Sequence, residues 1–378
     1  MNRRALQVLS LVTLTACGGE APPPAPPAPP PPPPPPVATA EPAASVTPSA
    51  APAVPAAPPG PAQLTFRPVG LPGATAPASL DYIAYDAAHA RVWVPVGGTG
   101  SVDVYDVEAG TFTTVGGFKT AEREFRGKKR TMGPSAVSLG DGVAYVGNRA
   151  TAEVCAVDTG ALKVLGCVKL ASPTDGVAYV APSKEVWVTT PRDNAIVVLD
   201  ASKPGALKVK TRVKLPGGPE GYAVDATRRV FLTNLEDRNE TVVIDLATHA
   251  PKATWKLDCG ADGPRGIAAD AGRGFVYVAC TDKVLVLDAA HDGARLATLD
   301  TGAGVDNIDW LEPQRLLLAA AGKAAKVTLA RIDDKGQATV VATGASTDGA
   351  RNGVLDASGS AYVADPVNAR LLVFPHAP

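Results

Sequence analysis

Residues 63–378 predict an all-β fold, a seven-bladed β-propeller, because one pattern of turns and strands recurs seven times along them. The period is roughly 40 to 46 residues, a spacing found in propeller blades and other β arrays. Each repeat opens with a turn of small residues, and the seven openings are residues 78–81, 133–136, 173–176, 218–221, 263–266, 304–307 and 350–353. Helical periodicity is almost absent.

Each opening is followed about ten residues later by a short aromatic or β-branched run, which is typical of a strand. Residues 186–188 (Val-Trp-Val) and 276–278 (Val-Tyr-Val) are examples. A further run ends in an aspartate in five repeats, and these aspartates are Asp106, Asp158, Asp200, Asp245 and Asp288. Because an aspartate side chain can accept a hydrogen bond from the backbone two residues on, each is expected to begin a turn.

Closure into a ring is favoured over an open solenoid by the two ends of the repeat region. The last repeat stops after three strands, with residues 371–374, whereas a spare strand precedes the first repeat and runs from Leu64 to Val69. Pairing the spare strand with the last repeat would complete the seventh blade and leave no open edge. Pro68 is compatible with an outermost strand.

The second strands of several repeats resemble the motif of the YVTN family of bacterial β-propellers, which is related to the NHL-like propellers. The resemblance lies in residues 145–148 (YVGN), 231–234 (FLTN) and 277–280 (YVAC) and extends over residues 63–378. It implies the propeller fold. It implies no single activity, since that family and its relatives include binding proteins, sensors and a few enzymes. Repeats one and six depart from the motif.

The amino terminus predicts export and a lipid anchor. Arg3 and Arg4 precede an apolar run that ends before Cys17, the layout of a secretory signal peptide over residues 1–16. Residues 14–17 (LTAC) resemble the bacterial lipobox, which implies that Cys17 becomes the lipidated first residue. The alternative is an ordinary signal peptide that is cut elsewhere. The resemblance places the chain on the cell envelope, in the outer membrane and facing the periplasm or the surface.

Residues 17–62 predict a disordered linker between that anchor and the propeller. They consist almost entirely of proline and alanine, so they cannot bury a core, and prolines favour an extended polyproline conformation. The linker would hold the propeller away from the membrane. The numbers of basic (36) and acidic (37) residues nearly cancel, so no global field directs the chain to nucleic acid, and a monomer is expected.

The loops that join successive blades predict a polar ring at one end of the central channel. Equivalent places in these loops carry Asp175, Glu220, Arg265, Asp306 and Asn352. Such a ring could bind a small ligand, and its oxygen atoms could hold Ca²⁺, although Arg265 among them opposes a metal site. The alternative is that these residues only line a solvated channel and form ion pairs around it. No other cofactor is expected, and the identity of any metal is unknown.

Two further groups of residues complete the predictions. A long connection between the first two repeats carries Arg126, Lys128, Lys129 and Arg130, which could meet an anionic protein partner or simply be solvated. Four cysteines remain in an oxidising compartment, and the repeat register pairs Cys155 with Cys167 and Cys259 with Cys280, with free thiols as the alternative.

The four histidines, His89, His249, His291 and His376, all fall away from the ring, so no Ser-His-Asp or Cys-His arrangement can form there. The sequence therefore favours a non-catalytic binding or scaffold module that presents this loop face to a protein or a small ligand. A metal-dependent enzyme similar to a lactonase or lyase, with carboxylates in the channel, is the alternative.

Overall fold

The computed structural model describes residues 60–125 and 127–376. The predicted signal peptide, Cys17 and nearly all of the predicted linker lie outside the described residues, as does Arg126 of the basic connection. No helix in the described part of the chain is long and apolar enough to cross a bilayer.

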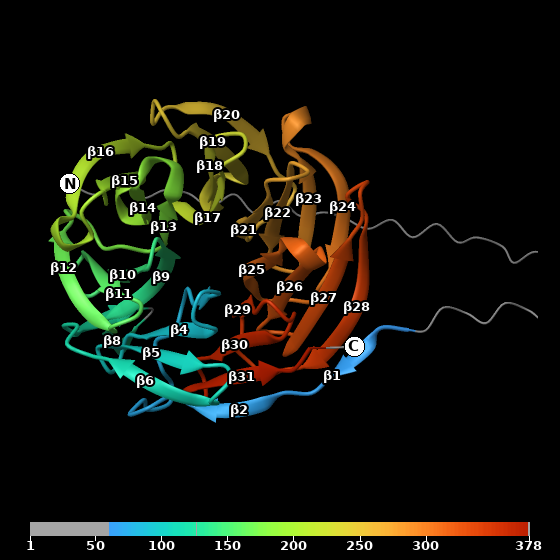
Figure 1. Cartoon of the computed structure of the whole chain (residues 1–378). Coiled ribbons are helices and arrows are strands. Elements are labelled where there is room, and N and C mark those ends of the chain that lie inside the picture. Colours follow the sequence, from blue (N-terminus) through green and yellow to red (C-terminus); the bar gives the residue numbers. More distant parts are fainter. Residues whose placement is uncertain (1–59, 126, 377–378) are drawn as a thin grey trace, which may run out of the picture. The chain divides into compact units, whose positions relative to one another are not determined.

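Seven antiparallel sheets of four strands stand in a ring, and one of them carries an additional parallel strand (Figure 1). The predicted seven-bladed β-propeller is therefore confirmed. In each blade the first strand lies nearest the centre of the ring and the last strand lies outermost.

The strands of the blades are β3 (Ala84–Asp86), β4 (Arg91–Val96), β5 (Ser101–Asp106) and β6 (Thr111–Val115) in blade one; β9 (Pro134–Gly140), β10 (Val143–Asn148), β11 (Glu153–Asp158) and β12 (Lys163–Lys169) in blade two; β13 (Val177–Val180), β14 (Glu185–Thr190), β15 (Ala195–Asp200) and β16 (Lys208–Lys214) in blade three; β17 (Pro219–Asp225), β18 (Val230–Leu235), β19 (Glu240–Asp245) and β20 (Pro251–Lys256) in blade four; β21 (Pro264–Asp270), β22 (Phe275–Cys280), β23 (Lys283–Asp288) and β24 (Ala294–Asp300) in blade five; β25 (Val305–Leu311), β26 (Leu316–Ala321), β27 (Lys326–Ile332) and β28 (Ala338–Ala345) in blade six; and β29 (Asn352–Leu355), β30 (Ala361–Asp365) and β31 (Arg370–Phe374) in blade seven. The helices of the described residues are single 3-10 turns, η1 (Ala181–Ser183), η2 (Pro191–Asp193), η3 (Pro204–Ala206), η4 (Glu236–Arg238), η5 (Ala289–His291) and η6 (Glu312–Gln314).

The middle strands are apolar on both faces because each sheet is covered by a neighbouring blade on either side. Trp187 of blade three and Phe231 of blade four, both fully buried, stack with ring centroids 4.8 Å apart. Burial of each such ring stabilises the fold by about 1.5–3 kcal/mol. The contacts between blades thus explain why these strands show unbroken apolar runs rather than alternation.

The five aspartates at the ends of third strands begin turns, as predicted. The Oδ1 atom of each accepts a hydrogen bond from the backbone N–H two residues on, and the donors are Glu108, Gly160, Ser202, Ala247 and Ala290. These bonds satisfy backbone N–H groups in the turns, where no neighbouring strand accepts a hydrogen bond from them.

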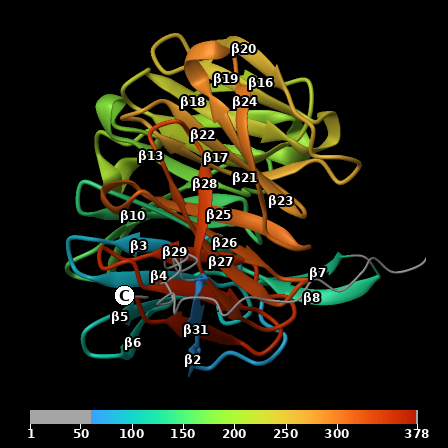
Figure 2. The same cartoon turned by 90° about the vertical axis from the view of Figure 1, so that its right-hand side faces the viewer.

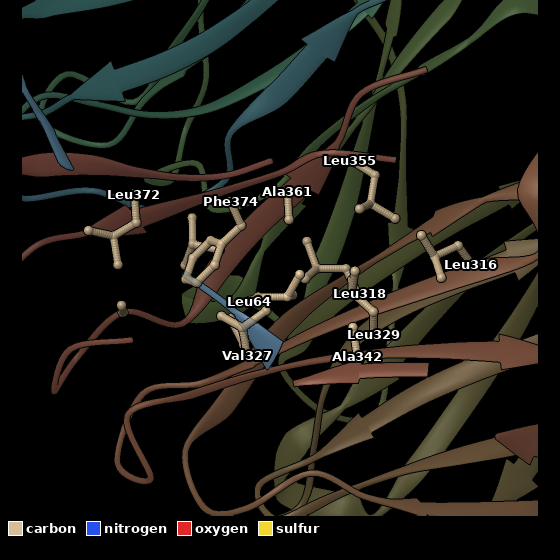
Figure 3. Packing of buried hydrophobic residues seen from close by; sticks show 13 residues of the cluster. Leu64, Leu316, Leu318, Val327, Leu329, Ala342, Leu355, Ala361, Leu372 and Phe374 are labelled. Carbon is tan, nitrogen blue, oxygen red and sulfur yellow. The ribbon is translucent and has the colours of Figure 1, made fainter. Parts of the chain in front are cut away.

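The ring closes through the amino-terminal segment, but the predicted single strand from Leu64 to Val69 is divided in two. β1 (Ala62–Leu64) runs parallel to β28 and extends blade six, whereas β2 (Arg67–Gly70) pairs antiparallel with β31 and completes blade seven. Leu64 packs with Phe374 and Leu329 in the apolar cluster between these blades (Figure 3). The amino-terminal segment therefore holds two neighbouring blades together.

Both predicted disulfides are present. Cys155 on β11 lies directly opposite Cys167 on β12, so this bond crosses the outer hairpin of blade two. Cys259 follows the last strand of blade four and bonds Cys280 at the end of β22, which links blades four and five covalently.

Candidate functional site

The innermost strands begin at one end of the central channel, and we call this end the mouth. Asp81 and Asp175 lie in the connections that lead into these strands, and Glu220 and Asp306 lie at the starts of β17 and β25. Arg149 comes from the loop between the second and third strands of blade two. Arg149 contacts both Asp81 and Asp175, so the two kinds of loop meet on the same face of the ring.

The side chains of two tyrosines from different blades meet inside the channel, below the mouth. Tyr82 belongs to blade one and Tyr222 to β17 of blade four, yet their rings stack with centroids 5.5 Å apart. The phenol of Tyr82 donates a hydrogen bond to the backbone oxygen of Glu220, at 3.4 Å. Gly176 of blade three makes room for Tyr222, because a Cβ atom there would lie 2.2 Å from the Cε1 atom of the ring. The tyrosine pair thus joins blades that are not neighbours.

Arginines at the mouth are each held by acidic side chains. Arg149 is shared between Asp81, at 2.9 Å, and Asp175. Arg265 contacts Glu236 at 2.7 Å, and Arg351 contacts Asp306 at 3.0 Å. Glu220 lies among these groups, and the charges of Asp81, Asp175, Glu236 and Asp306 all act on it. The side-chain amide of Asn352 donates a hydrogen bond to Asp81 at 3.0 Å.

Glu220 has no such partner. Among the described residues, no hydrogen bond or ion pair reaches its carboxylate. Its burial, with the negative charges of Asp175, Asp306, Asp81 and Glu236, raises its pKa well above the usual range. Asp175 also carries an unmatched oxygen, since its Oδ2 atom is buried without a partner. Burial raises the pKa of Asp175 to about 6, although Arg149 acts in the opposite direction.

A cavity of about 300 Å³ lies on the inner strands beneath the mouth. Its upper part is formed by Tyr82, Tyr222, Asn307 and Asn352, and its apolar walls are Ile83, Ile267, Ile308 and Val354. Asp309 also lines it and accepts a hydrogen bond from the backbone N–H of Leu355 at 2.7 Å. Burial raises the pKa of Asp309. This volume is at the lower end of the range for small-molecule sites.

The five ring residues predicted from the sequence, Asp175, Glu220, Arg265, Asp306 and Asn352, are brought together at the mouth. Six further contributors lie outside this predicted set of five, and they are Asp81, Arg149, Glu236, Arg351, Tyr82 and Tyr222. A signal for Tyr222 exists, because the equivalent register places in β21 and β25 carry Ile267 and Ile308, so an aromatic residue there is unusual among the repeats.

Within residues 60–125 and 127–376, no group of three or more Asp, Glu, His or Cys side chains is arranged to hold a metal ion. The carboxylates proposed as Ca²⁺ ligands instead contact arginines, except for Glu220. Three histidines lie at ordinary structural contacts: His89 against Asp86, His291 against Asp288, and His249 against Glu185.

The basic connection forms a hairpin of β7 (Ala121–Phe125) and β8 (Lys128–Met132), which extends away from the disc (Figure 2). Arg123 lies directly opposite Arg130, and Glu124 lies opposite Lys129. Lys128 lies on β8 opposite Phe125. Opposite charges on directly opposite residues stabilise a strand pair and like charges destabilise it, so these two pairs act in opposite directions on the hairpin.

Comparison with known proteins shows the fold and nothing finer. No protein-family model matches the chain, and no curated protein does so. A chain of the crystal structure of the mitotic checkpoint complex superposes with a TM-score of 0.66 at 14% identity, over 89% of this chain and 98% of that chain. A chain of Kuenenia stuttgartiensis hydrazine synthase superposes with a TM-score of 0.67 at 15% identity, over 81% of this chain and 99% of that chain. Both are propeller proteins.

Proposed function

We propose that this protein is a non-catalytic binding module of the YVTN type, carried on a lipid-anchored, proline-rich stalk, and that its channel mouth receives a small ligand. The observation that carries the proposal is the cavity of about 300 Å³ directly beneath the mouth, where charged side chains with unmatched oxygens surround its entrance. A polar entrance above apolar walls is the usual composition of a small-molecule site. The ion pairs around the entrance would orient the ligand.

The contacts that the mouth carboxylates make with arginines favour a binding role over a metal-dependent lactonase or lyase. Arg149 and Arg351 contact Asp175 and Asp306, so a metal ion at these carboxylates would lie beside two guanidinium groups that repel it. The predicted export and lipidation at Cys17 would place the module at the cell envelope. Replacement of Cys17 by serine should release the protein from the membrane fraction, and retention would contradict the anchor.

The binding proposal is tested with a variant whose cavity is filled. Ala269 lines the cavity, so Ala269→Trp should occupy it, whereas Ala357→Trp adds the same side chain at an exposed turn between β29 and β30. The full-length chain and both variants would be incubated with a soluble extract of the producing cells and washed, and small molecules released on denaturation would be identified by mass spectrometry. A compound retained by the wild type and Ala357→Trp but lost from Ala269→Trp supports the proposal. Equal retention by all three proteins contradicts it.

The β7–β8 hairpin favours a second contact, with an acidic protein. It extends beyond the disc, and it belongs to the face that carries the mouth because it joins blades one and two. Reversal of charge at Lys129 and Arg123 should abolish the capture of such a partner, with Lys335→Glu on the turn between β27 and β28 as the control. Unchanged capture would remove the hairpin from the proposal.

A further inference from the structure

The mouth has an excess of negative charge that its arginines do not balance. Five carboxylates meet three guanidinium groups there, so the balance is −2 when all are ionised (3 − 5). Each arginine already contacts an acidic partner. An anionic ligand that contacted one of these three arginines would therefore have to displace a carboxylate from it.

Glu220 is the group that a ligand could satisfy. Its carboxylate is the one at the mouth with no hydrogen-bond or ion-pair partner among the described residues, and it lies among other carboxylates. The buried Oδ2 atom of Asp175 is a second acceptor without a donor. A donor with a positive charge would pair with these acceptors and offset the mutual repulsion of the carboxylates.

The walls beneath the mouth suit an organic cation better than a metal ion. Ile83, Ile267 and Ile308 offer no side-chain oxygen. The amide and carboxylate oxygens of the lining come from Asn307, Asp309 and Asn352, fewer than the six to eight ligands that Ca²⁺ takes. The aliphatic walls can bury the hydrocarbon body of such a ligand.

We propose that the channel binds a small organic amine or ammonium compound, with its cationic group against Glu220 and its apolar body in the cavity beneath. This assignment rests on the proposed function of the channel as a ligand site.

The test compares ligands that differ in charge and share a shape. The full-length chain would be titrated by calorimetry with three amines, propylamine, hexylamine and benzylamine, with benzyl alcohol as the neutral counterpart, with benzoate as the anion, and with calcium chloride. We expect an amine to bind and its uncharged or anionic counterparts to bind at least about tenfold more weakly. Glu220→Gln should weaken amine binding about tenfold or more. Asp282→Asn, which removes an exposed carboxylate from a loop on the same face, should leave it unchanged.

Three results would overturn the assignment. Preferential binding of benzoate or of Ca²⁺ would keep the channel as a ligand site and refute the organic cation. Loss of amine binding in Asp309→Asn but not in Glu220→Gln would place the cation at the carboxylate that lines the cavity and not at the mouth. Absence of binding by every amine, when Ala269→Trp still loses a compound that the wild type retains from extract, would refute the ligand class and leave the binding proposal standing. Circular dichroism and thermal melting of each variant establish that it is folded before it is titrated.

Discussion

Leu64 gives the most direct test of how the ring closes. Its side chain is 7% exposed and lies in the cluster between blades six and seven, although the strand that carries it has three residues. Backbone packing supports the same placement, because Leu64 lies on Gly344, where a Cβ atom would be 2.8 Å from the Leu64 backbone oxygen. Replacement of Leu64 by alanine therefore removes buried carbon without touching the other strands.

The expected cost follows from the three carbon atoms that are deleted. At about 0.8 kcal/mol for each, the transfer contribution is roughly 2.4 kcal/mol, and incomplete collapse of the cavity brings the total to about 3 kcal/mol. For a domain of roughly 300 residues, an unfolding entropy of about 2.1 cal/mol/K per residue gives about 0.6 kcal/mol per degree. Leu64→Ala should then lower the Tm by about 5 °C.

Thermal and urea denaturation of the full-length chain would measure this loss. Gln63→Ala is the matched control, because the neighbouring side chain is exposed and its single hydrogen bond, to Thr343 at 3.3 Å, is solvent-accessible. That control should change the free energy of unfolding by less than about 0.5 kcal/mol. If Leu64→Ala behaves like Gln63→Ala, β1 does not hold blade six in solution and the account of ring closure is wrong.

Three further changes probe the mouth, the outer hairpin of blade two and the channel. The pKa of Glu220 is higher in the folded protein than in the unfolded chain, so ionisation of Glu220 destabilises the fold as the pH rises from the unfolded pKa through the folded one. Glu220→Gln removes this ionisation. The substitution should therefore stabilise the protein by about 1 kcal/mol or more at pH 8 and by almost nothing near pH 4. A pH-independent effect in urea melts would contradict this. Replacement of Cys155 and Cys167 by alanine removes a bond that spans 12 residues and should cost about 3 kcal/mol of unfolding free energy in urea, and a loss below about 1 kcal/mol would show that the bond is not formed. Gly176→Ala would force Tyr222 aside and should cost about 1–3 kcal/mol with an altered near-ultraviolet tyrosine signal, whereas an unchanged signal would mean that the ring is not seated there.

The sequence predicted the number of blades and both disulfides because these depend on the repeat. Turn openings and strand runs recur locally, so the equivalent positions of Cys155 and Cys167 on neighbouring strands follow from counting. The division of the segment from Leu64 to Val69 between two blades could not be predicted in this way, since it depends on the room that Gly344 leaves beside β28.

At the mouth, too, the positions that follow from the repeat could be predicted, whereas the contacts that depend on side-chain packing could not. Repeat register places Glu220 and Asp306 at equivalent positions, so their proximity could be foreseen. Register cannot show which arginine contacts which carboxylate, because that depends on side chains that extend between blades, as Arg149 does. The stacking of Tyr82 on Tyr222 depends on a distance across the ring, which no local pattern contains.

The seventh blade, which combines strands from both ends of the propeller, also determines when the ring can close during synthesis and folding of the chain. β2 is among the first parts of the propeller to be synthesised, yet its partner β31 is nearly the last. The sheet edge that β2 will occupy therefore cannot form until almost every residue is available, and long-range pairing of this kind slows folding and exposes edges to aggregation. A chain that stops short of Arg370 would lack this partner altogether, so premature termination should produce an unclosed ring that quality-control proteases can recognise.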